Sequence, residues 1–159
     1  MTSKPAKPAR AKKPFDGARL IPLLRAPHDD KHLVAILREL GHTKDLLESS
    51  RTWPPSIELK KLGLALQFEG KRTGKPKLLQ IQFELRRRWT GHSKYRGLLP
   101  YGLSPDLRTA DRSTALVGHA TKVTEGDDWS YYDFPTHQVA MGFGKTFVET
   151  VFVMADKSV

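Results

Sequence analysis

Apolar residues recur every three or four positions in the stretch that follows Pro27. These residues are Leu33, Ile36, Leu37 and Leu40. Such spacing gathers the side chains on one face of a helix. Asp29 or Asp30 stands where a side chain caps a first turn, and Gly41 stands where a helix commonly ends. The pattern predicts an amphipathic helix between them.

Two later runs alternate between apolar and polar positions, which is the period of a strand with one buried face. The first covers residues 62–68 and the second, LLQIQFELR, covers residues 78–86. The Gly- and Lys-rich segment GKRTGKPK at 70–77 separates them. They predict an antiparallel hairpin with a long loop, and the helix and hairpin together form a first unit that ends near residue 88.

The second half of the chain repeats this order of patterns. TADRSTALVGHATKV at 109–123 predicts a shorter helix that ends at Gly118. Residues 127–144 predict one or two strands, and residues 145–155 predict a last strand that is rich in β-forming residues. The second half is therefore expected to be a second helix-plus-strand unit.

Short sequence echoes favour a degenerate tandem repeat. GHTK at 41–44 resembles GHATK at 118–122, and LALQFEG at 64–70 resembles VAMGFG at 139–144. Chance similarity of short motifs is the alternative. The predicted fold class is α+β, with two tandem helix-plus-antiparallel-meander units in a continuous or paired sheet and helices on one face. The predicted boundaries are a disordered basic tail (1–17), a first unit (18–93), a Gly- and Pro-containing joint (94–107) and a second unit (108–159).

Charge and composition narrow the class of protein. Of 159 residues, 38% are hydrophobic, which is enough for a core, and the formal net charge is +10. Five positive charges lie within the first 13 residues, which leaves about +5 for the rest. The chain has no cysteine, so it contains no disulfide or cysteine ligand. No signal-peptide core or membrane-span pattern is found in it, and we expect a cytoplasmic protein without a membrane span.

Motifs that would indicate catalysis or metal binding are incomplete. GFGKT at 142–146 lacks the earlier glycine and the following helix of a phosphate-binding loop, so a hairpin turn is expected. His28 and His32 have ligand spacing without a third ligand, and Asp127 and Asp128 fit a solvated turn. No catalytic triad is indicated. We therefore expect no enzymatic activity, no cofactor and no metal.

Aromatic and basic residues are the candidates for partner binding, because Tyr, Trp and Arg dominate protein–protein hot spots. On a strand, Trp129 and Tyr131 share one face and Tyr132 lies on the other. The alternatives are that the aromatic residues pack the core and that the basic segments are solvated loops. The predicted partner-binding residues are Arg86, Arg87, Arg88, Trp89, Lys94, Tyr95, Arg96, Tyr101, Trp129 and Tyr131.

Two segments carry a family resemblance. KYRGLLPYGL at 94–103 and WSYYDFPTHQVAMGF at 129–143 are similar to segments of bacterial toxin-immunity-type proteins with two tandem β-lactamase-inhibitor-protein/SmpA-BamE-like units. The resemblance covers roughly residues 18–155, but the chain has Val117, Gly118, His119 and Ala120 where the pattern has LG-x-P. It implies a non-enzymatic inhibitor that occludes the active site of a cognate toxin, and the basic body suits an acidic toxin surface.

Nucleic-acid binding, or an accessory or adaptor role, is the alternative. The basic tail, the 70–77 segment and the 86–96 segment suit phosphate, and Trp89 or Tyr95 suits stacking on bases. No RNP1-like strand, helix-turn-helix pattern or GXXG clamp accompanies them. Any affinity of this kind is expected to be nonspecific and sensitive to salt.

Overall fold

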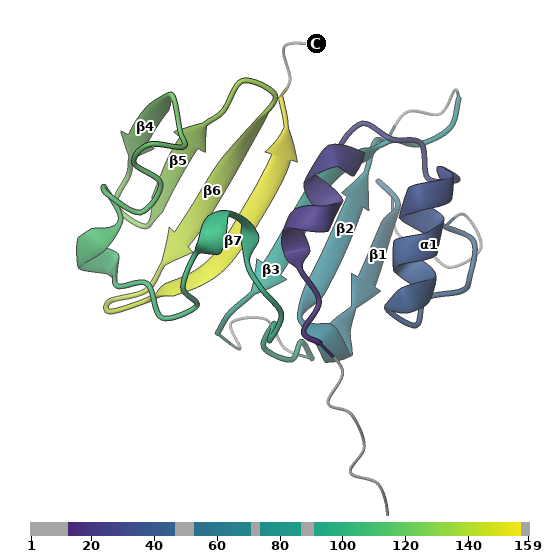
Figure 1. Cartoon of the computed structure of the whole chain (residues 1–159), viewed down its shortest axis with the longest axis horizontal. Coiled ribbons are helices and arrows are strands. Elements are labelled where there is room, and N and C mark those ends of the chain that lie inside the picture. Colours follow the sequence, from purple (N-terminus) through teal and green to yellow (C-terminus); the bar gives the residue numbers. More distant parts are fainter. Residues whose placement is uncertain (1–12, 47–52, 71–73, 87–90, 157–159) are drawn as a thin grey trace, which may run out of the picture.

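A single antiparallel sheet of seven strands organises the protein in the computed structural model (Figure 1). The structure describes residues 13–46, 53–70, 74–86 and 91–156. The strand order is β1-β2-β3-β7-β6-β5-β4. The strands are β1 (Ser56–Leu59), β2 (Leu64–Phe68), β3 (Leu78–Glu84), β4 (Lys122–Glu125), β5 (Trp129–Asp133), β6 (His137–Phe143) and β7 (Val148–Ala155).

One α-helix and several short 3-10 helices accompany the sheet in the described residues. They are α1 (Lys31–Glu39), η1 (Gly17–Leu23), η2 (Lys60–Leu62), η3 (Pro100–Gly102) and η4 (Thr109–Asp111). In Figure 1, η1, α1 and the connection through η3 lie in front of the strands, on one side of the sheet. None of the described helices is long and apolar enough to cross a bilayer.

The predicted fold of two tandem helix-plus-meander units is wrong. Both halves contribute strands to one sheet, and β3 pairs directly with β7. The helix predicted between residue 109 and Gly118 is replaced by the three-residue η4 and a series of turns. The physical reason is the lack of an apolar stripe, since the large apolar residues of this segment, Leu116 and Val117, are adjacent and not three or four positions apart. Thr109 is instead fixed to the β6–β7 turn, because its hydroxyl donates to the Gly144 carbonyl at 2.9 Å.

Two local predictions in the first half are confirmed, the capped helix and the hairpin, although the strand predicted from residue 62 begins at Leu64 and Leu62 lies exposed in η2. The Asp30 side chain caps α1 by accepting hydrogen bonds from the amides of His32 at 2.9 Å and Leu33 at 3.1 Å. Gly41 follows the helix with a φ of +88°, the left-handed conformation that favours glycine. The hairpin forms as an antiparallel pair of β2 and β3.

The sheet has two faces of different character. The face toward η1 and α1 carries the core, because alternate residues of every central strand point to that side. Its fully buried members include Leu66, Ile81, Val139 and Val153. The residues between them on the same strands point to the opposite face, and many are half-buried or exposed.

The N-terminal segment joins the fold before the predicted boundary at residue 17. Residues 1–12 of the predicted tail lie outside the described residues. Asp16 forms a parallel bridge with Leu98, and the Gly17 amide donates to the Leu98 carbonyl at 2.8 Å. The last residues of the predicted tail therefore contact the predicted joint. The boundaries at 93 and 107 stay predictions.

Candidate functional site

The predicted binding residues are separated into several places by the fold. Arg87, Arg88 and Trp89 lie outside the described residues. The guanidinium of Arg86 forms an ion pair with Asp106 at 3.1 Å and lies 4.8 Å from the centre of the Phe147 ring. Arg86 thus connects the end of β3 to the segment before η4 and to the β6–β7 turn.

Trp129 and Tyr131 lie on the face of the sheet away from the core. Tyr131 is 38% exposed, whereas the neighbouring Tyr132 is fully buried on the core side. The predicted separation of these tyrosines onto opposite faces is confirmed. Trp129 pairs with Gly142 in register and packs against Phe152 with ring centroids 5.5 Å apart, so its ring extends across β6 toward β7.

The register continues this surface across the sheet. Tyr131 on β5 lies opposite Ala140 on β6, and Ala140 lies opposite Phe152 on β7. Phe152 in turn lies opposite Gln82 on β3. We call the larger side chains on this side of the sheet the open sheet face. Its members are Gln80, Gln82, Trp129, Tyr131, Gln138, Phe152 and Met154.

Several members of the open sheet face were missed by sequence reasoning. Phe152 and Met154 belong to the continuous β-forming run at 145–155, in which most residues are apolar. A strand of this composition does not show from its own pattern which side is buried. In the structure, Val151 and Val153 are buried, whereas Phe152 and Met154 are half-buried. This alternation shows which side of β7 is open only after the strands that pair with β7 are known.

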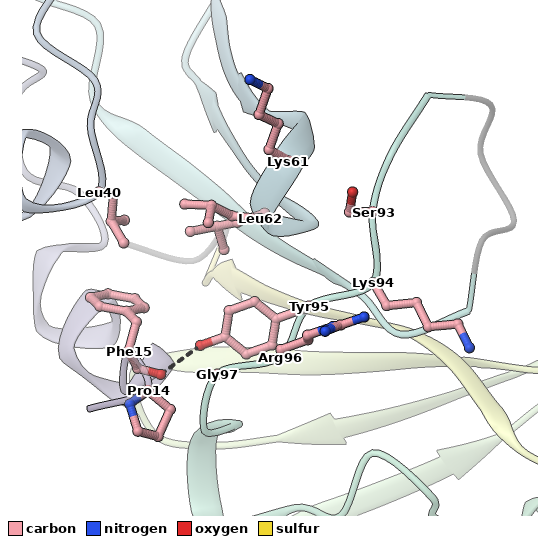
Figure 2. Close-up of a pocket in the computed structure, with 11 residues that line it drawn as sticks. Pro14, Phe15, Leu40, Lys61, Leu62, Ser93, Lys94, Tyr95, Arg96 and Gly97 are labelled. Carbon is pink, nitrogen blue, oxygen red and sulfur yellow. Dashed lines mark hydrogen bonds between the residues drawn. The ribbon is translucent and has the colours of Figure 1, made fainter. Parts of the chain in front are cut away.

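A second candidate surface is a pocket beside the N-terminal segment (Figure 2). Its volume is about 620 Å³, within the range of ligand sites. Pro14 and Phe15 form one side, Leu40 comes from the end of α1, and η2 and the extended 93–97 segment complete the wall. We call this site the basic pocket. It is lined by Pro14, Phe15, Leu40, Lys61, Leu62, Leu64, Ser93, Lys94, Tyr95, Arg96 and Gly97.

Backbone hydrogen bonds hold the 93–97 segment in place. The Ser93 amide donates to the Lys60 carbonyl at 2.7 Å, and the Tyr95 amide donates to the Glu84 carbonyl at 2.6 Å. Gly63 packs against the backbone of this segment. It has a φ of +66°, and there is no room for a Cβ atom at this position. The pocket wall is therefore fixed to η2 and to the end of β3.

Tyr95 is a structural member of the basic pocket. Its side chain is only 7% exposed, and its ring packs edge-on against Phe83 at 4.9 Å. The hydroxyl shares its one proton between the carbonyls of Phe15 at 3.0 Å and Leu98 at 3.1 Å. Burial, with a smaller effect of the Asp16 carboxylate, raises the pKa of Tyr95. The neutral hydroxyl fastens the N-terminal segment to the pocket wall.

The rim of the basic pocket is cationic. Lys61, Lys94 and Arg96 are all exposed. Other basic residues form ion pairs, such as Arg19 with Glu39 at 2.8 Å. Among the residues that the structure describes, no carboxylate forms an ion pair with the three rim cations. The pocket thus combines an apolar lining with positive charges that no carboxylate of the described residues pairs with.

Tyr101 belongs to a stack of aromatic rings inside the molecule. Its ring lies on Phe134 with centroids 4.7 Å apart, and Phe134 stacks on His137 at 4.6 Å. The Tyr101 hydroxyl pairs with Nε2 of His137, and Thr136 Oγ1 lies 3.0 Å from Nδ1 of the same ring. Burial lowers the pKa of His137 and raises the pKa of Tyr101. The cluster ties η3 to the β5–β6 turn.

In the described part of the chain, no group of three or more His, Asp or Glu side chains is arranged to hold a metal ion. His28 lies before α1 begins at Lys31, so His28 and His32 do not share one helical face.

Comparison with known proteins gives no relative, because no protein-family model, curated protein or solved structure matches the chain. The open sheet face and the basic pocket remain as the candidate sites.

Proposed function

We propose that the protein is a non-enzymatic inhibitor that binds another protein through the open sheet face. In its most specific form it is a cytoplasmic immunity protein that neutralises a cognate bacterial toxin by covering the toxin's active site. The observation that carries the proposal is the row of Tyr131, Ala140, Phe152 and Gln82 across four adjacent strands. No cofactor takes part in this mechanism.

The composition of the open sheet face suits protein recognition. Trp and Tyr are enriched among the few residues that supply most of the binding energy at protein interfaces, because large aromatic rings bury much area. Trp129 and Phe152 already contact each other, so their rings are ordered before a partner arrives. A preorganised surface loses less conformational entropy on binding.

The glutamines beside the aromatic rings add hydrogen-bonding groups. Gln80 and Gln138 flank Met154 on the two neighbouring strands. The amide of Gln138 is oriented by donating to Asp133 Oδ1 at 2.7 Å. An apolar centre bordered by polar groups resembles the usual anatomy of a protein interface. The positive net charge of the chain further favours association with an acidic partner.

The test uses the genes that neighbour this one in its genome. Each neighbour is expressed alone in a bacterial host and then together with this protein, and growth is measured. We expect one neighbour to stop growth and this protein to restore it. The double variant Tyr131→Ser/Phe152→Ser should lose the protection, while Val117→Ser, which changes an exposed apolar residue elsewhere, should keep it.

Two controls make this experiment decisive. Circular dichroism melting must show that the double variant folds as the wild type does, since both residues are only partly buried. A purified toxin with an enzymatic activity should be inhibited in vitro at a one-to-one ratio. The proposal fails if no neighbouring gene is toxic, or if the folded double variant protects as well as the wild type.

A further inference from the structure

We infer that the basic pocket binds an acidic peptide segment of a partner protein, with one large apolar side chain seated among Phe15, Leu40 and Leu62. The inference takes from the proposed function only that the ligand is a protein. It adds a second docking site that is separate from the open sheet face, and it assigns the chemistry of the segment that occupies this site.

The apolar lining indicates the anchor. In Figure 2 the side chain of Leu62 lies above the Tyr95 ring, and those of Phe15 and Leu40 lie to its left. They come from the N-terminal segment, the end of α1 and η2, so the cavity is bounded by parts of the chain that are far apart in sequence. A volume of about 620 Å³ admits a leucine or aromatic side chain together with its backbone. Removing such a side chain from water favours binding.

The rim indicates the charge of the ligand. Lys61 reaches the pocket from η2, whereas Lys94 and Arg96 belong to the 93–97 segment. In the described residues these three cations form no ion pair with a carboxylate. A ligand with carboxylates on both sides of its apolar anchor meets these charges without displacing any carboxylate of the described residues. Charge complementarity of this kind speeds encounter and selects among partners.

An elongated chain fits the surface better than a compact ligand does. Leu62 keeps 38% of its surface exposed, so the apolar lining continues from the cavity onto the outside of η2. Nucleic acid would pair with the cations but offers no aliphatic group for Leu40 and Leu62. The Tyr95 ring is also too buried to stack on a base. A peptide with an apolar anchor and flanking carboxylates satisfies both parts of the site.

Phage display of random dodecapeptides on the full chain tests the inference. We expect enrichment of peptides with one Leu, Phe, Tyr or Trp close to two or more Asp or Glu residues. The best peptide, synthesised with a fluorescent label, is then titrated by anisotropy. Lys61→Glu/Lys94→Glu/Arg96→Glu should weaken its binding at least about tenfold. Leu62→Asp should weaken it comparably. The charge-matched control Lys77→Glu/Lys122→Glu/Lys145→Glu changes exposed lysines outside the pocket and should have little effect.

The outcomes separate this inference from the proposed function. Tyr131→Ser/Phe152→Ser should leave the affinity for the peptide unchanged. The inference is wrong if no peptide is enriched, if the enriched peptides lack acidic residues, or if the pocket variants fold and bind the peptide normally. It is also wrong if single-stranded DNA displaces the peptide at physiological salt. If the peptide binds as expected but no neighbouring gene is toxic, or the folded Tyr131→Ser/Phe152→Ser variant still protects, only the proposed function is overturned.

Discussion

The hydroxyl of Tyr95 donates to the carbonyl of Phe15, 80 residues earlier in the chain, at a distance of 3.0 Å. Two backbone hydrogen bonds of 2.8 Å lie beside it. The Gly17 amide donates to the Leu98 carbonyl, and the Leu98 amide donates to the Phe15 carbonyl. These contacts align the N-terminal segment with the segment after β3. One wall of the basic pocket depends on this alignment.

Tyr95→Phe removes the hydroxyl but keeps the ring on Phe83. We expect the free energy of unfolding to fall by about 1 kcal/mol, because one partly buried hydrogen bond is lost while each carbonyl keeps its amide donor. Urea denaturation measures this change. Tyr131→Phe is the matched control, since the structure gives the Tyr131 hydroxyl no hydrogen bond within the described residues, and its effect should be close to zero. Equal losses in the two variants would contradict the assigned role of the Tyr95 hydroxyl.

Gly97→Ala introduces a methyl group where the chain has no space. A Cβ atom at Gly97 would contact the Tyr95 hydroxyl and the Phe15 carbonyl at less than normal separation, so the N-terminal segment must move away. We expect a loss of about 1–3 kcal/mol in unfolding free energy. Protease cleavage near Phe15 should become faster, because the segment is held less tightly.

Gly102→Ala is the control for this prediction. Gly102 has a φ of +65°, but no atom lies within 4 Å of the place that a Cβ atom would occupy. The substitution therefore meets only the backbone cost of the left-handed conformation, about 1 kcal/mol. It should leave cleavage near Phe15 unchanged. If Gly97→Ala proves as mild as Gly102→Ala in both measurements, the packing of Phe15 against the 95–98 segment is looser than the structure shows.

The elements that could be predicted from sequence are those with a strong local pattern. The helix at α1 has both an apolar face and a cap, and the alternation around Leu66 and Ile81 places both residues on the buried side of a hairpin. Tyr131 and Tyr132 lie on opposite faces of the sheet because successive side chains of a strand alternate between the two faces. In each case the information lies within a few neighbouring residues.

The parts that could not be predicted depend on contacts between distant residues. Pairing of β3 with β7 joins Ile81 to Val153, and no local pattern selects that partner. The same pairing brings Gln82 next to Phe152 and so creates the centre of the open sheet face. In the second half, GHATK resembles the end of a helix, but Val117 is exposed and the segment folds into turns. Similar short sequences therefore do not establish a structural repeat.

Asp30→Ala tests the cap that the sequence predicts. The Asp30 carboxylate accepts hydrogen bonds from the amides of His32 and Leu33, and its removal should reduce the unfolding free energy by about 1 kcal/mol. Asp29→Ala should cost less, because Asp29 forms an exposed ion pair with Lys75. Thermal melting monitored by circular dichroism ranks the variants. The reverse order would mean that Asp29, the other capping candidate, contributes more to the helix.

The buried His137 ring makes stability depend on pH. Its folded-state pKa lies below the ordinary value of 6.5 because burial disfavours the charged ring. The unfolded chain therefore binds a proton at a higher pH than the folded protein does, so the contribution of this residue is fully present above about pH 7 and is lost as the pH falls below about 6.5. Urea denaturation between about pH 7.5 and pH 5, above the range where most carboxylates titrate, should show this fall.

His137→Phe isolates the contribution of the imidazole. The substituted ring can still stack on Phe134, while the pairing with the Tyr101 hydroxyl is lost. We expect a less stable protein at pH 7.5 whose unfolding free energy declines less steeply toward pH 5. His119→Gln is the matched control, because His119 is exposed at the edge of the same cluster, with its ring centroid 5.7 Å from that of Tyr101. If the slope survives in His137→Phe and disappears in His119→Gln, the pH dependence belongs to the exposed ring, and burial of His137 is not its cause.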